Sequence, residues 1–400
     1  MGFDRYAAEE LRDRFRTSFG QGSWRQHLYV QAPGRTELAG NHTDHEGGDV
    51  IAAAVDRYVR GIFSPNEEDI IRVESEGYGI TEIRVDQLAA RKDERNTTAS
   101  LIRGLAACFA ERGYTPQGFD AYLCSGVPAG SGLSSSAAFE LEVAQGMNVL
   151  WAKGLLAPED LALMAQRAER DWFGKPCGLM DQAAVALGGI QHMSFATPGV
   201  IDAHAIDFDF AEAGFAICLV DVGADHAANT DDYAAVPAEM QAVARALGAQ
   251  VLSEVAASAV IEALPRLRAE LGDRAVLRAL HYYNEEQLVS LRREALRAKD
   301  IERFLTLTAS SGASSAMLLQ NVSVGGASSQ PSMLAIALAE SILVGHGAAR
   351  VHGGGFGGTI QAFVPLELVD EFSRGMDAVF GEGACGVYNI EHEGASTAWL

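Results

Sequence analysis

The segment GVPAGSGLSSSAAFE, residues 126–140, decides the fold of this chain. It follows an alternating apolar run, FDAYLCS (119–125), which predicts a strand. After it, apolar residues recur at helical spacing: Phe139, Val143, Met147 and Leu150. The glycines and serines of residues 130–136 therefore stand where a strand leads into a helix. Because the first N–H groups of a helix lack partners and its dipole is positive there, this turn predicts an anion-binding site.

Other interpretations of the glycine-rich segments are less satisfactory. A serine-capped helix after a tight turn explains one Ser and one Gly, but not GSGLSSS. The lysine phosphate loop GxxxxGK[ST] is absent, because Gly174–Lys175 is followed by proline and has Glu169 where the first glycine should stand. GGGFGG (353–358) matches GxGxxG, but a strand-like segment follows it and too little chain remains for a dinucleotide domain. We expect a glycine hairpin that lets a backbone or ligand approach, or a plain structural turn.

The composition limits the class of protein and its partners. The chain has 400 residues, more than one hydrophobic core usually supports, so we expect two domains. No apolar stretch is long enough to span a bilayer, the first residues lack a secretory signal, and the five cysteines are scattered, so we expect a cytoplasmic protein. The 31 basic and 53 acidic residues give a net charge of −22, which disfavours nucleic acid and anionic membranes as partners. A small anionic ligand stays possible, because backbone N–H groups and a metal ion supply local positive potential.

Hydrophobic patterns along the chain predict a sheet-rich first half and a helix-rich second half. We place a domain boundary near residue 200, which gives domains 1–200 and 201–400. Further predictions are strands at 27–32, 70–75, 82–88 and 205–222, a second helix with Pro158 in its first turn, helices over 236–310, a Ser/Gly-rich loop over 310–332, a helix over 332–345, and strands ending at His352 and covering 359–365.

Two further segments concentrate polar residues. Residues 32–50 crowd hydrogen-bonding side chains between apolar runs, a pattern that suits a polyhydroxylated ligand: Arg35, Asn41, His42, Asp44 and His45. A solvated turn or a metal site at the two histidines and Asp44 are the alternatives. Residues 177–189, CGLMDQAAVALGG, place Asp181 in apolar surroundings, where a carboxylate needs a partner or a task. Arg35 is a candidate partner.

Together, PGRTELAGNHTDHEGG, PAGSGLSSSAAFE and GGGFGG resemble the three motifs of the GHMP small-molecule kinases, and the first, with CGLMDQ, resembles the galactokinases. The resemblance extends from about residue 28 to residue 364. It implies an α+β fold of two domains, an N-terminal mixed sheet with helices and a C-terminal ferredoxin-like domain, with the active site between them. It also implies an ATP-dependent sugar 1-kinase that uses Mg²⁺.

The resemblance assigns roles residue by residue. Asp181 takes or orients the proton of the anomeric hydroxyl, and Arg35 steadies the charge that builds during transfer. Ser136 and Glu169 are the implied Mg²⁺ ligands. The implied ATP-binding residues are Gly130, Ser131, Gly132, Leu133, Ser134, Ser135 and Ser136, and the implied sugar-binding residues are Asn41, His42, Thr43, Asp44 and Tyr233.

The chain departs from the family at GNHTDH, where galactokinases usually carry GEHTDY. Asn41 removes a negative charge near the C6 hydroxyl of the sugar, so a galacturonate or amino-sugar kinase is an alternative to galactose. A non-catalytic sugar sensor is a further alternative, but such proteins tend to carry a damaged serine turn, and here it is complete. HTD and CGLMDQ disfavour a kinase of mevalonate or homoserine. Residues 321–332, NVSVGGASSQPS, also depart from the family. The resemblance therefore leaves open the details of the lid that covers the sugar or the nucleotide.

Overall fold

The computed structural model describes residues 5–20, 26–128, 132–175, 177–197, 199–223, 230–323, 328–356 and 358–400. Its α-helices are α1 (Arg5–Phe19), α2 (Thr98–Glu111), α3 (Ser135–Ala152), α4 (Pro158–Arg167), α5 (Met180–Leu187), α6 (Thr230–Ala246), α7 (Ala257–Glu262), α8 (Leu264–Leu271), α9 (Asp273–Arg297), α10 (Ile301–Ser314), α11 (Pro331–Leu343) and α12 (Val369–Phe380). Shorter helical turns are η1 (Asp44–Glu46), η2 (Lys92–Glu94), η3 (Ala168–Phe173), η5 (Leu252–Glu254), η6 (Ser315–Leu319) and η7 (Leu366–Leu368).

The strands form two sheets. They are β1 (Leu28–Ala39), β2 (Asp49–Pro65), β3 (Ile70–Ser75), β4 (Gly79–Arg84), β5 (Phe119–Ser125), β6 (Ile190–Ser194), β7 (Asp202–Ile206), β8 (Phe215–Asp221), β9 (Ala348–Val351), β10 (Thr359–Pro365), β11 (Cys385–Tyr388) and β12 (Ser396–Trp399). The larger sheet has the order β12-β1-β2-β5-β3-β4, with β6 paired to β2 and β7 paired to β6. The smaller sheet has the order β11-β8-β10-β9.

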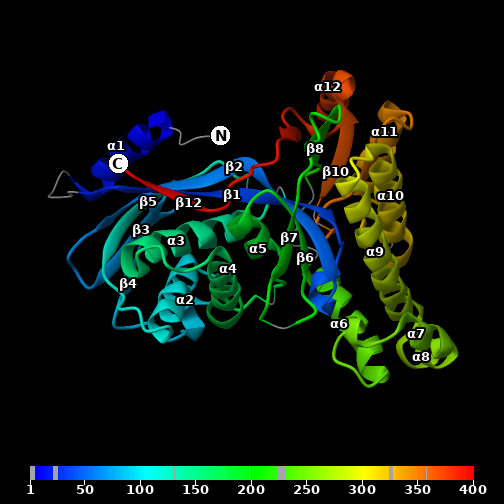
Figure 1. The fold of residues 1–400 in the computed structure, drawn as a ribbon, viewed down its shortest axis with the longest axis horizontal. Coiled ribbons are helices and arrows are strands. Elements are labelled where there is room, and N and C mark those ends of the chain that lie inside the picture. Colours follow the sequence, from blue (N-terminus) through cyan, green and yellow to red (C-terminus); the bar gives the residue numbers. More distant parts are fainter. Residues whose placement is uncertain are drawn as a thin grey trace.

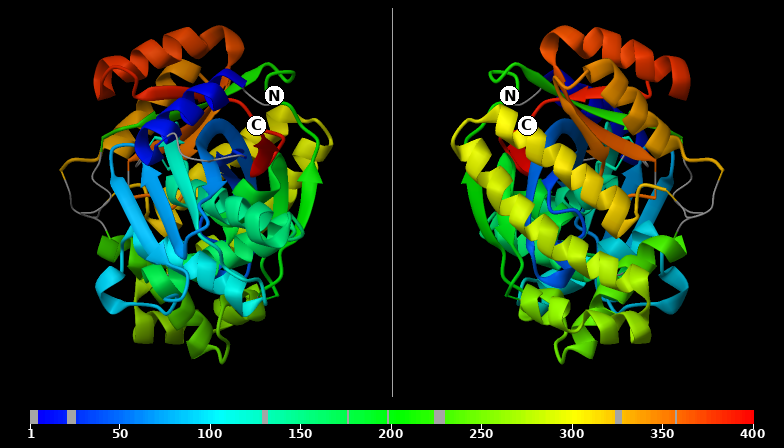
Figure 2. Two further views of the ribbon diagram at one scale, coloured as in Figure 1. Left: turned by 90° about the vertical axis from the view of Figure 1, so that its left-hand side faces the viewer. Right: turned by 90° about the vertical axis from the view of Figure 1, so that its right-hand side faces the viewer.

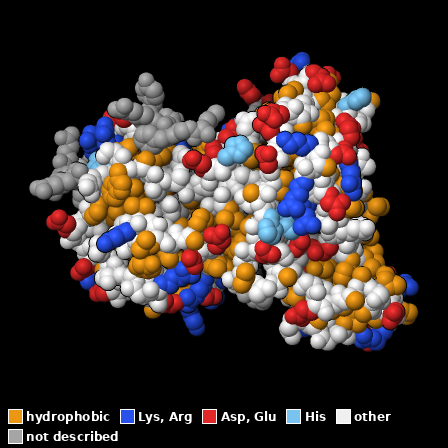
Figure 3. All heavy atoms as spheres, in the orientation of Figure 1, with side chains coloured by type: hydrophobic (Ala, Val, Ile, Leu, Met, Phe, Trp, Pro, Cys, Tyr) orange, Lys and Arg blue, Asp and Glu red, His pale blue; other side chains and the backbone are white. Residues whose placement is uncertain are grey.

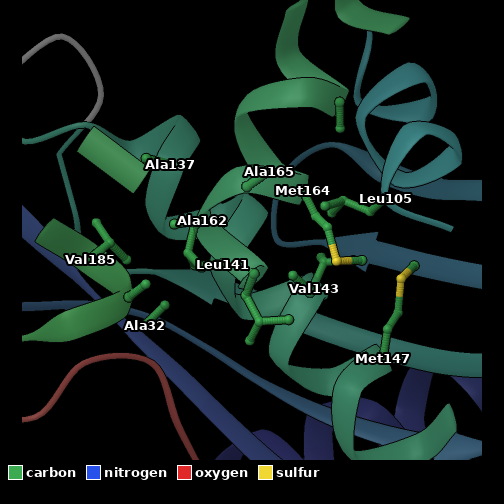
Figure 4. Packing of buried hydrophobic residues seen from close by; sticks show 14 of the residues in the cluster. Ala32, Leu105, Ala137, Leu141, Val143, Met147, Ala162, Met164, Ala165 and Val185 are labelled. Atoms are coloured by element: carbon green, nitrogen blue, oxygen red, sulfur yellow. The ribbon is translucent and has the colours of Figure 1, made fainter. Parts of the chain in front are cut away.

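Helices cover both faces of the larger sheet. The helices α2 to α5 lie on one face and α1 lies on the other (Figure 1). Between α2 to α5 and the sheet lies the largest hydrophobic cluster, in which small and branched side chains interlock (Figure 4). Labelled members come from several elements: Ala32, Leu105, Ala137, Leu141, Val143, Met147, Ala162, Met164, Ala165 and Val185. This core holds α3 and α5 against β1, and so positions the two helix starts that carry the polar motifs.

The second half of the chain packs against the first through helices and the smaller sheet. The long helices α9 and α10 run side by side (Figure 2, right), and α11 and α12 cover the smaller sheet. A hydrophobic cluster joins β1, β2 and β6 to α9, α10, β8 and β10. Phe210, Phe304 and Phe363 form its aromatic centre, with ring centroids 5.1 to 5.6 Å apart. The two halves therefore share a buried core.

The structure confirms most predicted elements and corrects two. The strand predicted over 205–222 is two strands, β7 and β8, separated by a turn at residues 207–214. The loop predicted over 310–332 is wrong over its first part, because α10 runs to Ser314 and η6 continues to Leu319. Buried contacts account for this helix: the hydroxyl of Ser311 donates to Glu285 at 2.8 Å, and Gly312 packs on Arg350. Tertiary contacts here outweigh the local preference for a loop.

Charged side chains of both signs are interspersed on the face seen in Figure 3, and Lys and Arg form no continuous surface there. Within the described ranges, none of the helices combines the length and the apolar character needed to cross a bilayer.

Candidate active site

An aspartate held by a guanidinium and a hydroxyl lies where β1, α3 and α5 meet. Asp181 stands in the first turn of α5, and its Oδ1 accepts a hydrogen bond of 2.7 Å from Nε of Arg35 on β1. Its Oδ2 accepts a hydrogen bond from the hydroxyl of Ser134, immediately before α3. The structure thus brings together the acid and the guanidinium that were paired from sequence, 146 residues apart in the chain.

These contacts set the charge state of Asp181. Burial alone raises the pKa of its carboxyl, because burial disfavours the charged form. The charge of Arg35 and the hydrogen bonds from Arg35 and Ser134 outweigh burial, and the pKa falls below its usual value. Asp181 is therefore ionised at neutral pH and able to accept a proton.

The glycine-serine turn packs closely against β1. The guanidinium of Arg35 donates to the carbonyl of Gly132, and the N–H of Arg35 donates to the carbonyl of Leu133 at 3.1 Å. Gly132 and Ser134 have left-handed backbone conformations, with φ of 72° and 55°. A Cβ at position 132 would lie 2.8 Å from Nδ1 of His352, so the turn requires glycine there. This packing starts α3 directly beside Asp181.

The structure separates the residues predicted to bind the ATP phosphates. Gly130 and Ser131 lie outside the described residues. Ser134 uses its hydroxyl on Asp181, whereas Ser135 and Ser136 occupy the first turn of α3 and are partly exposed. The amino end of a helix of 18 residues presents unpaired N–H groups and a partial positive charge. This helix start can therefore bind a phosphate group next to the carboxylate.

A second carboxylate, Asp44, lies in η1 close to Asp181. Its Oδ2 lies 1.7 Å from the position that a Cβ would take at Gly178, so the glycine of CGLMDQ leaves the space that this carboxylate occupies. Burial raises the pKa of Asp44, and the charge of Asp181 adds to this rise, although His45 opposes it. Asp44 is partly exposed and can accept a hydrogen bond from a hydroxyl group of a ligand.

His42 and Tyr233 form an aromatic wall beside the two carboxylates. Their ring centroids lie 5.5 Å apart, and Tyr233 packs so closely on Gly354 that a Cβ there would lie 2.1 Å from its ring. Burial raises the pKa of Tyr233 to about 12, with Asp44 contributing. Tyr233 therefore keeps its hydroxyl proton at neutral pH. Its side chain is half exposed and available to a ligand.

The two histidines of the polar loop are engaged with the protein. Nε2 of His42 donates to the carbonyl of Gly354 at 2.8 Å, and its Nδ1 lies 3.1 Å from Nε2 of His45. Burial and the neighbouring His45 lower the pKa of His42 to about 3, so this ring is neutral. Among the residues that the structure describes, no group of three or more His, Cys, Asp and Glu side chains is placed to hold a metal ion. The alternative of a metal site at these histidines therefore has no support from the structure.

Asn41 and Thr43 are placed differently from the sequence-based expectation that they bind the sugar. Asn41 is fully buried, its amide N–H group donates to the carbonyl of Gly353, and its Oδ1 accepts from Asn321 at 2.9 Å and from Ser315 at 3.2 Å. The hydroxyl of Thr43 is also buried, and it is hydrogen-bonded to backbone carbonyls of its own loop. Both side chains shape the loop that carries Asp44, and the structure does not support direct contact of either one with a ligand.

Glu169 in η3 is the centre of a second cluster of polar and charged side chains. Its carboxylate lies 2.9 Å from Nζ of Lys175 and accepts a hydrogen bond of 2.8 Å from Nε2 of Gln182. The same amide group donates to Glu140 on α3 at 3.1 Å. The sequence around Lys175 rules out a phosphate loop of the lysine type and indicates no other role for this residue, so its position beside Glu169 comes from the structure. The signal in the sequence is the Gly-Lys pair, five and six residues after Glu169.

The side-chain oxygen atoms near Glu169 are of the chemical kind that Mg²⁺ prefers. Oε1 of Glu140 is buried without a hydrogen-bond partner in the described part of the chain, and burial together with the charge of Glu169 raises the pKa of Glu140 well above its usual value. This excess of carboxylate oxygen favours a hard cation. Mg²⁺ commonly takes only one or two protein ligands and completes its shell with phosphate and water oxygens. The carboxylate of Glu169 is a donor of this kind, and so is the hydroxyl of Ser136 in the first turn of α3.

A cavity of about 250 Å³ lies between the second-half helices and the glycine hairpin. Its lining is Asp232, Arg274, Arg278, Ala316, Gln320, Val322, Ser323, Met333 and Phe356. Neither Asp181 nor Arg35 lines it, so the Asp181 carboxylate lies outside this cavity.

Comparisons with known proteins agree with this architecture. A family model described as "GHMP kinases N terminal domain" matches residues 100–189, and the "Galactokinase galactose-binding signature" matches residues 13–65. Among solved structures, a galactokinase of Lactococcus lactis complexed with galactose has a TM-score of 0.83 at 22% identity, covering 98% of this chain and 99% of the other. A mevalonate kinase has a TM-score of 0.66 at 15% identity, covering 91% and 99%. The fold is therefore that of the GHMP kinases.

Sequence relatives narrow the assignment. A galactokinase of Streptomyces coelicolor is 32% identical over 380 residues, 92% of each chain. A galactokinase of Roseiflexus is 32% identical over 374 residues, covering 91% of this chain and 89% of the relative. The chain belongs to the galactokinase family.

Proposed function

We propose that this protein transfers the γ-phosphate of ATP to the C1 hydroxyl of α-D-galactose, with Mg²⁺ as the metal ion. The observation that carries the proposal is the ionised Asp181, which is held by Arg35 and Ser134 beside the amino end of α3. This arrangement combines an acceptor for a proton with a binding site for phosphate. Family membership supports the choice of substrates.

In the proposed step, the Asp181 carboxylate accepts the proton of the anomeric hydroxyl. The sugar oxygen forms a bond to the γ-phosphorus, and the bond from this phosphorus to the bridging oxygen breaks, which releases ADP. Arg35 keeps Asp181 ionised before transfer, and its charge stabilises the negative charge that develops around the reacting oxygens. Phosphoryl transfer depends mainly on positioning and charge neutralisation, and the fixed contacts of Asp181 provide the positioning.

The first turn of α3 is the proposed site for the phosphates, with Ser135 contributing its hydroxyl and backbone N–H group. Ser136 and Glu169 are the proposed ligands of Mg²⁺. When bound, this ion neutralises part of the charge of the triphosphate. Asp44 and Tyr233 are the proposed sugar contacts, because both are partly exposed next to Asp181. His42 is buried and hydrogen-bonded to Gly354, so its proposed part is to hold Tyr233 in position.

A panel assay tests this function. Purified protein is incubated with ATP and Mg²⁺, without sugar and with galactose, galacturonate or galactosamine, and ADP release is measured. We expect release that depends on sugar and is fastest with galactose. Faster release with galacturonate or galactosamine would move the substrate to that sugar. Equal release with and without every sugar would contradict a sugar kinase, and no release at all would favour a sugar sensor.

A further inference from the structure

Lys175 provides a cation to the site from outside the glycine-serine turn. It follows η3, which ends at Gly174 in a left-handed conformation with φ of 94°. The N–H groups of Gly174 and Lys175 both donate to the carbonyl of Glu169, at 2.9 and 3.1 Å. This tight turn returns the chain toward Glu169 and places the ammonium group 2.9 Å from its carboxylate. The charge of Lys175 also interacts with those of Asp181 and Tyr233, so its ammonium group lies within electrostatic range of the Asp181 carboxylate.

Negative charge around Lys175 favours a cation at this position. Asp181 and Glu169 are carboxylates in ion pairs with Arg35 and Lys175, and ATP adds several negative charges. Arg35 is already engaged, since its guanidinium is hydrogen-bonded to Asp181 and to the carbonyl of Gly132. A triphosphate bound at the start of α3 therefore needs positive charge beyond that of Arg35.

Exposure distinguishes the two cations. The side chain of Arg35 is 8% exposed, whereas that of Lys175 is 52% exposed and its partner Glu169 is 4% exposed. An ammonium group has three hydrogen-bond donors, and Lys175 uses one of them on Glu169. Lys175 can therefore contact a ligand without giving up this ion pair, and Glu169 fixes the position of the ammonium group beside the site.

We propose that Lys175 binds the terminal phosphate of ATP and takes the part that a lysine of the phosphate loop takes in other nucleotide-binding proteins. This proposal rests on the proposed use of ATP at the same site. Lys175 donates to a γ-phosphate oxygen while Glu169 accepts from the same ammonium group. The lysine thereby links the nucleotide to η3 and to the helix that carries Asp181.

Equilibrium binding tests this role without catalysis. The affinities of wild-type protein, Lys175→Met and Lys175→Arg for ATP, ADP and AMP are measured by calorimetry, in EDTA and in parallel with Mg²⁺. Loss of a hydrogen bond to a charged group weakens binding by about tenfold or more. We expect Lys175→Met to show this loss for ATP, a smaller loss for ADP and none for AMP, whereas Lys175→Arg retains most of the ATP affinity. Lys175→Met should also raise the KM for ATP more than it lowers kcat.

Lys153→Met is the matched control. Lys153 is exposed at the carboxyl end of α3, and the 18 residues of this helix put about 27 Å between its two ends. This variant should bind ATP as the wild type does.

Two results would overturn the role of Lys175. One is wild-type affinity of Lys175→Met for ATP in both buffers. The other is a gain in Mg²⁺ affinity with no loss of ATP affinity, which is what a mere counter-ion of Glu169 would give. Failure of the proposed function looks different, because ATP then binds in a manner that depends on Lys175 while no sugar is phosphorylated.

Discussion

At the scale of single residues, the proposed chemistry depends on neighbours that come from distant parts of the sequence. Asp181 lies on α5, but its charge is set by Arg35 on β1 and Ser134 before α3. The pairing of Arg35 with Asp181 could be predicted, because a carboxylate in an apolar segment needs a partner of opposite charge. The positions of Asn41 and Lys175 could not, because they depend on which side of a loop faces the protein, and a local pattern does not encode that.

Replacing Ser134 with Ala should shift the pH dependence of turnover. The hydroxyl of Ser134 donates to the carboxylate and stabilises its charged form, so its loss raises the pKa of Asp181. Wild-type kcat/KM should stay constant as the pH is lowered and should decrease only at a pH below the usual aspartate pKa of about 3.9. In Ser134→Ala this drop moves to higher pH. An unchanged pH profile of kcat/KM for the sugar would show that the hydroxyl does not control Asp181.

Replacing Gly178 with Ala should weaken sugar binding selectively. The backbone at Gly178 is not in the left-handed region, so its conformation suits alanine, but the added Cβ would lie 1.7 Å from Oδ2 of Asp44. The carboxylate must move, and the loss of one hydrogen bond from a charged group raises the KM for the sugar about tenfold or more. Binding of ATP, measured by calorimetry, is the internal control and should be unchanged. An equal loss for both substrates would mean that the site as a whole is distorted.

At the scale of elements, helix α3 combines a polar start with a buried body. Its apolar spacing could be predicted from sequence, and the structure confirms a helix that begins at Ser135, directly after Ser134. The extension of α10 through a Ser-rich segment could not be predicted, because it depends on contacts with α9 and β9. In this segment the hydroxyl groups of Ser311, Ser314 and Ser315 bond to buried partners, and that of Ser314 lies 2.8 Å from Nδ1 of His281. Serine-rich composition predicts a loop only where such partners are missing.

Glu142 on α3 should limit the stability of the protein. It is fully buried, and neither carboxylate oxygen has a hydrogen-bond partner within the described ranges. Burial raises the pKa of Glu142 well above its usual value. Glu142→Leu should therefore raise the free energy of unfolding by about 1 to 3 kcal/mol.

The sign of the pH effect follows from the raised pKa of Glu142. The carboxyl group of Glu142 stays protonated in the folded state. The free energy of unfolding is therefore highest below the unfolded-state pKa of about 4.3, and the contribution of Glu142 is lost as the pH rises through the folded-state pKa. In urea unfolding, the gain from Glu142→Leu should be larger at pH 8 than at pH 5. The exposed Glu302→Leu should change stability by only about 0.5 kcal/mol. A loss of stability in Glu142→Leu would mean that the carboxyl group has a stabilising partner.

At the scale of the whole molecule, buried polar contacts tie the two halves together around the site. Glu37 on β1 pairs with Arg350 on β9 at 2.9 Å, and the N–H of Gly40 donates to Glu285 on α9 at 3.2 Å. The two-domain division at residue 200 stays a prediction. Strands β7 and β12 come after that residue and pair in the larger sheet. The pairing of β12 with β1 joins the two ends of the chain, and such long-range pairing leaves no local signal in the sequence.

Asn41→Glu tests the role of the loop in this interface. The sequence suggested that a glutamate here would change the selectivity at C6 of the sugar, but Asn41 is fully buried and its amide bonds to Gly353, Ser315 and Asn321. A carboxylate would lose the donated hydrogen bond and lie near Glu37. We expect a loss of about 3 kcal/mol in unfolding free energy. A stable variant with altered ratios of kcat/KM among galactose, galactosamine and galacturonate would instead support direct contact of residue 41 with the sugar.

The central claim is that the Asp181 carboxylate accepts the proton of the sugar as the γ-phosphate of ATP is transferred. The most direct measurement is ³¹P NMR of wild-type protein and Asp181→Asn, each incubated with ATP, Mg²⁺ and α-D-galactose. For the wild type, the account predicts a sugar 1-phosphate signal that grows together with an equimolar signal of ADP. In Asp181→Asn, product formation should fall by about 10²- to 10⁴-fold while the melting temperature and ATP binding are kept. Product formation by Asp181→Asn at the wild-type rate, or ADP without sugar phosphate from the wild type, would contradict it.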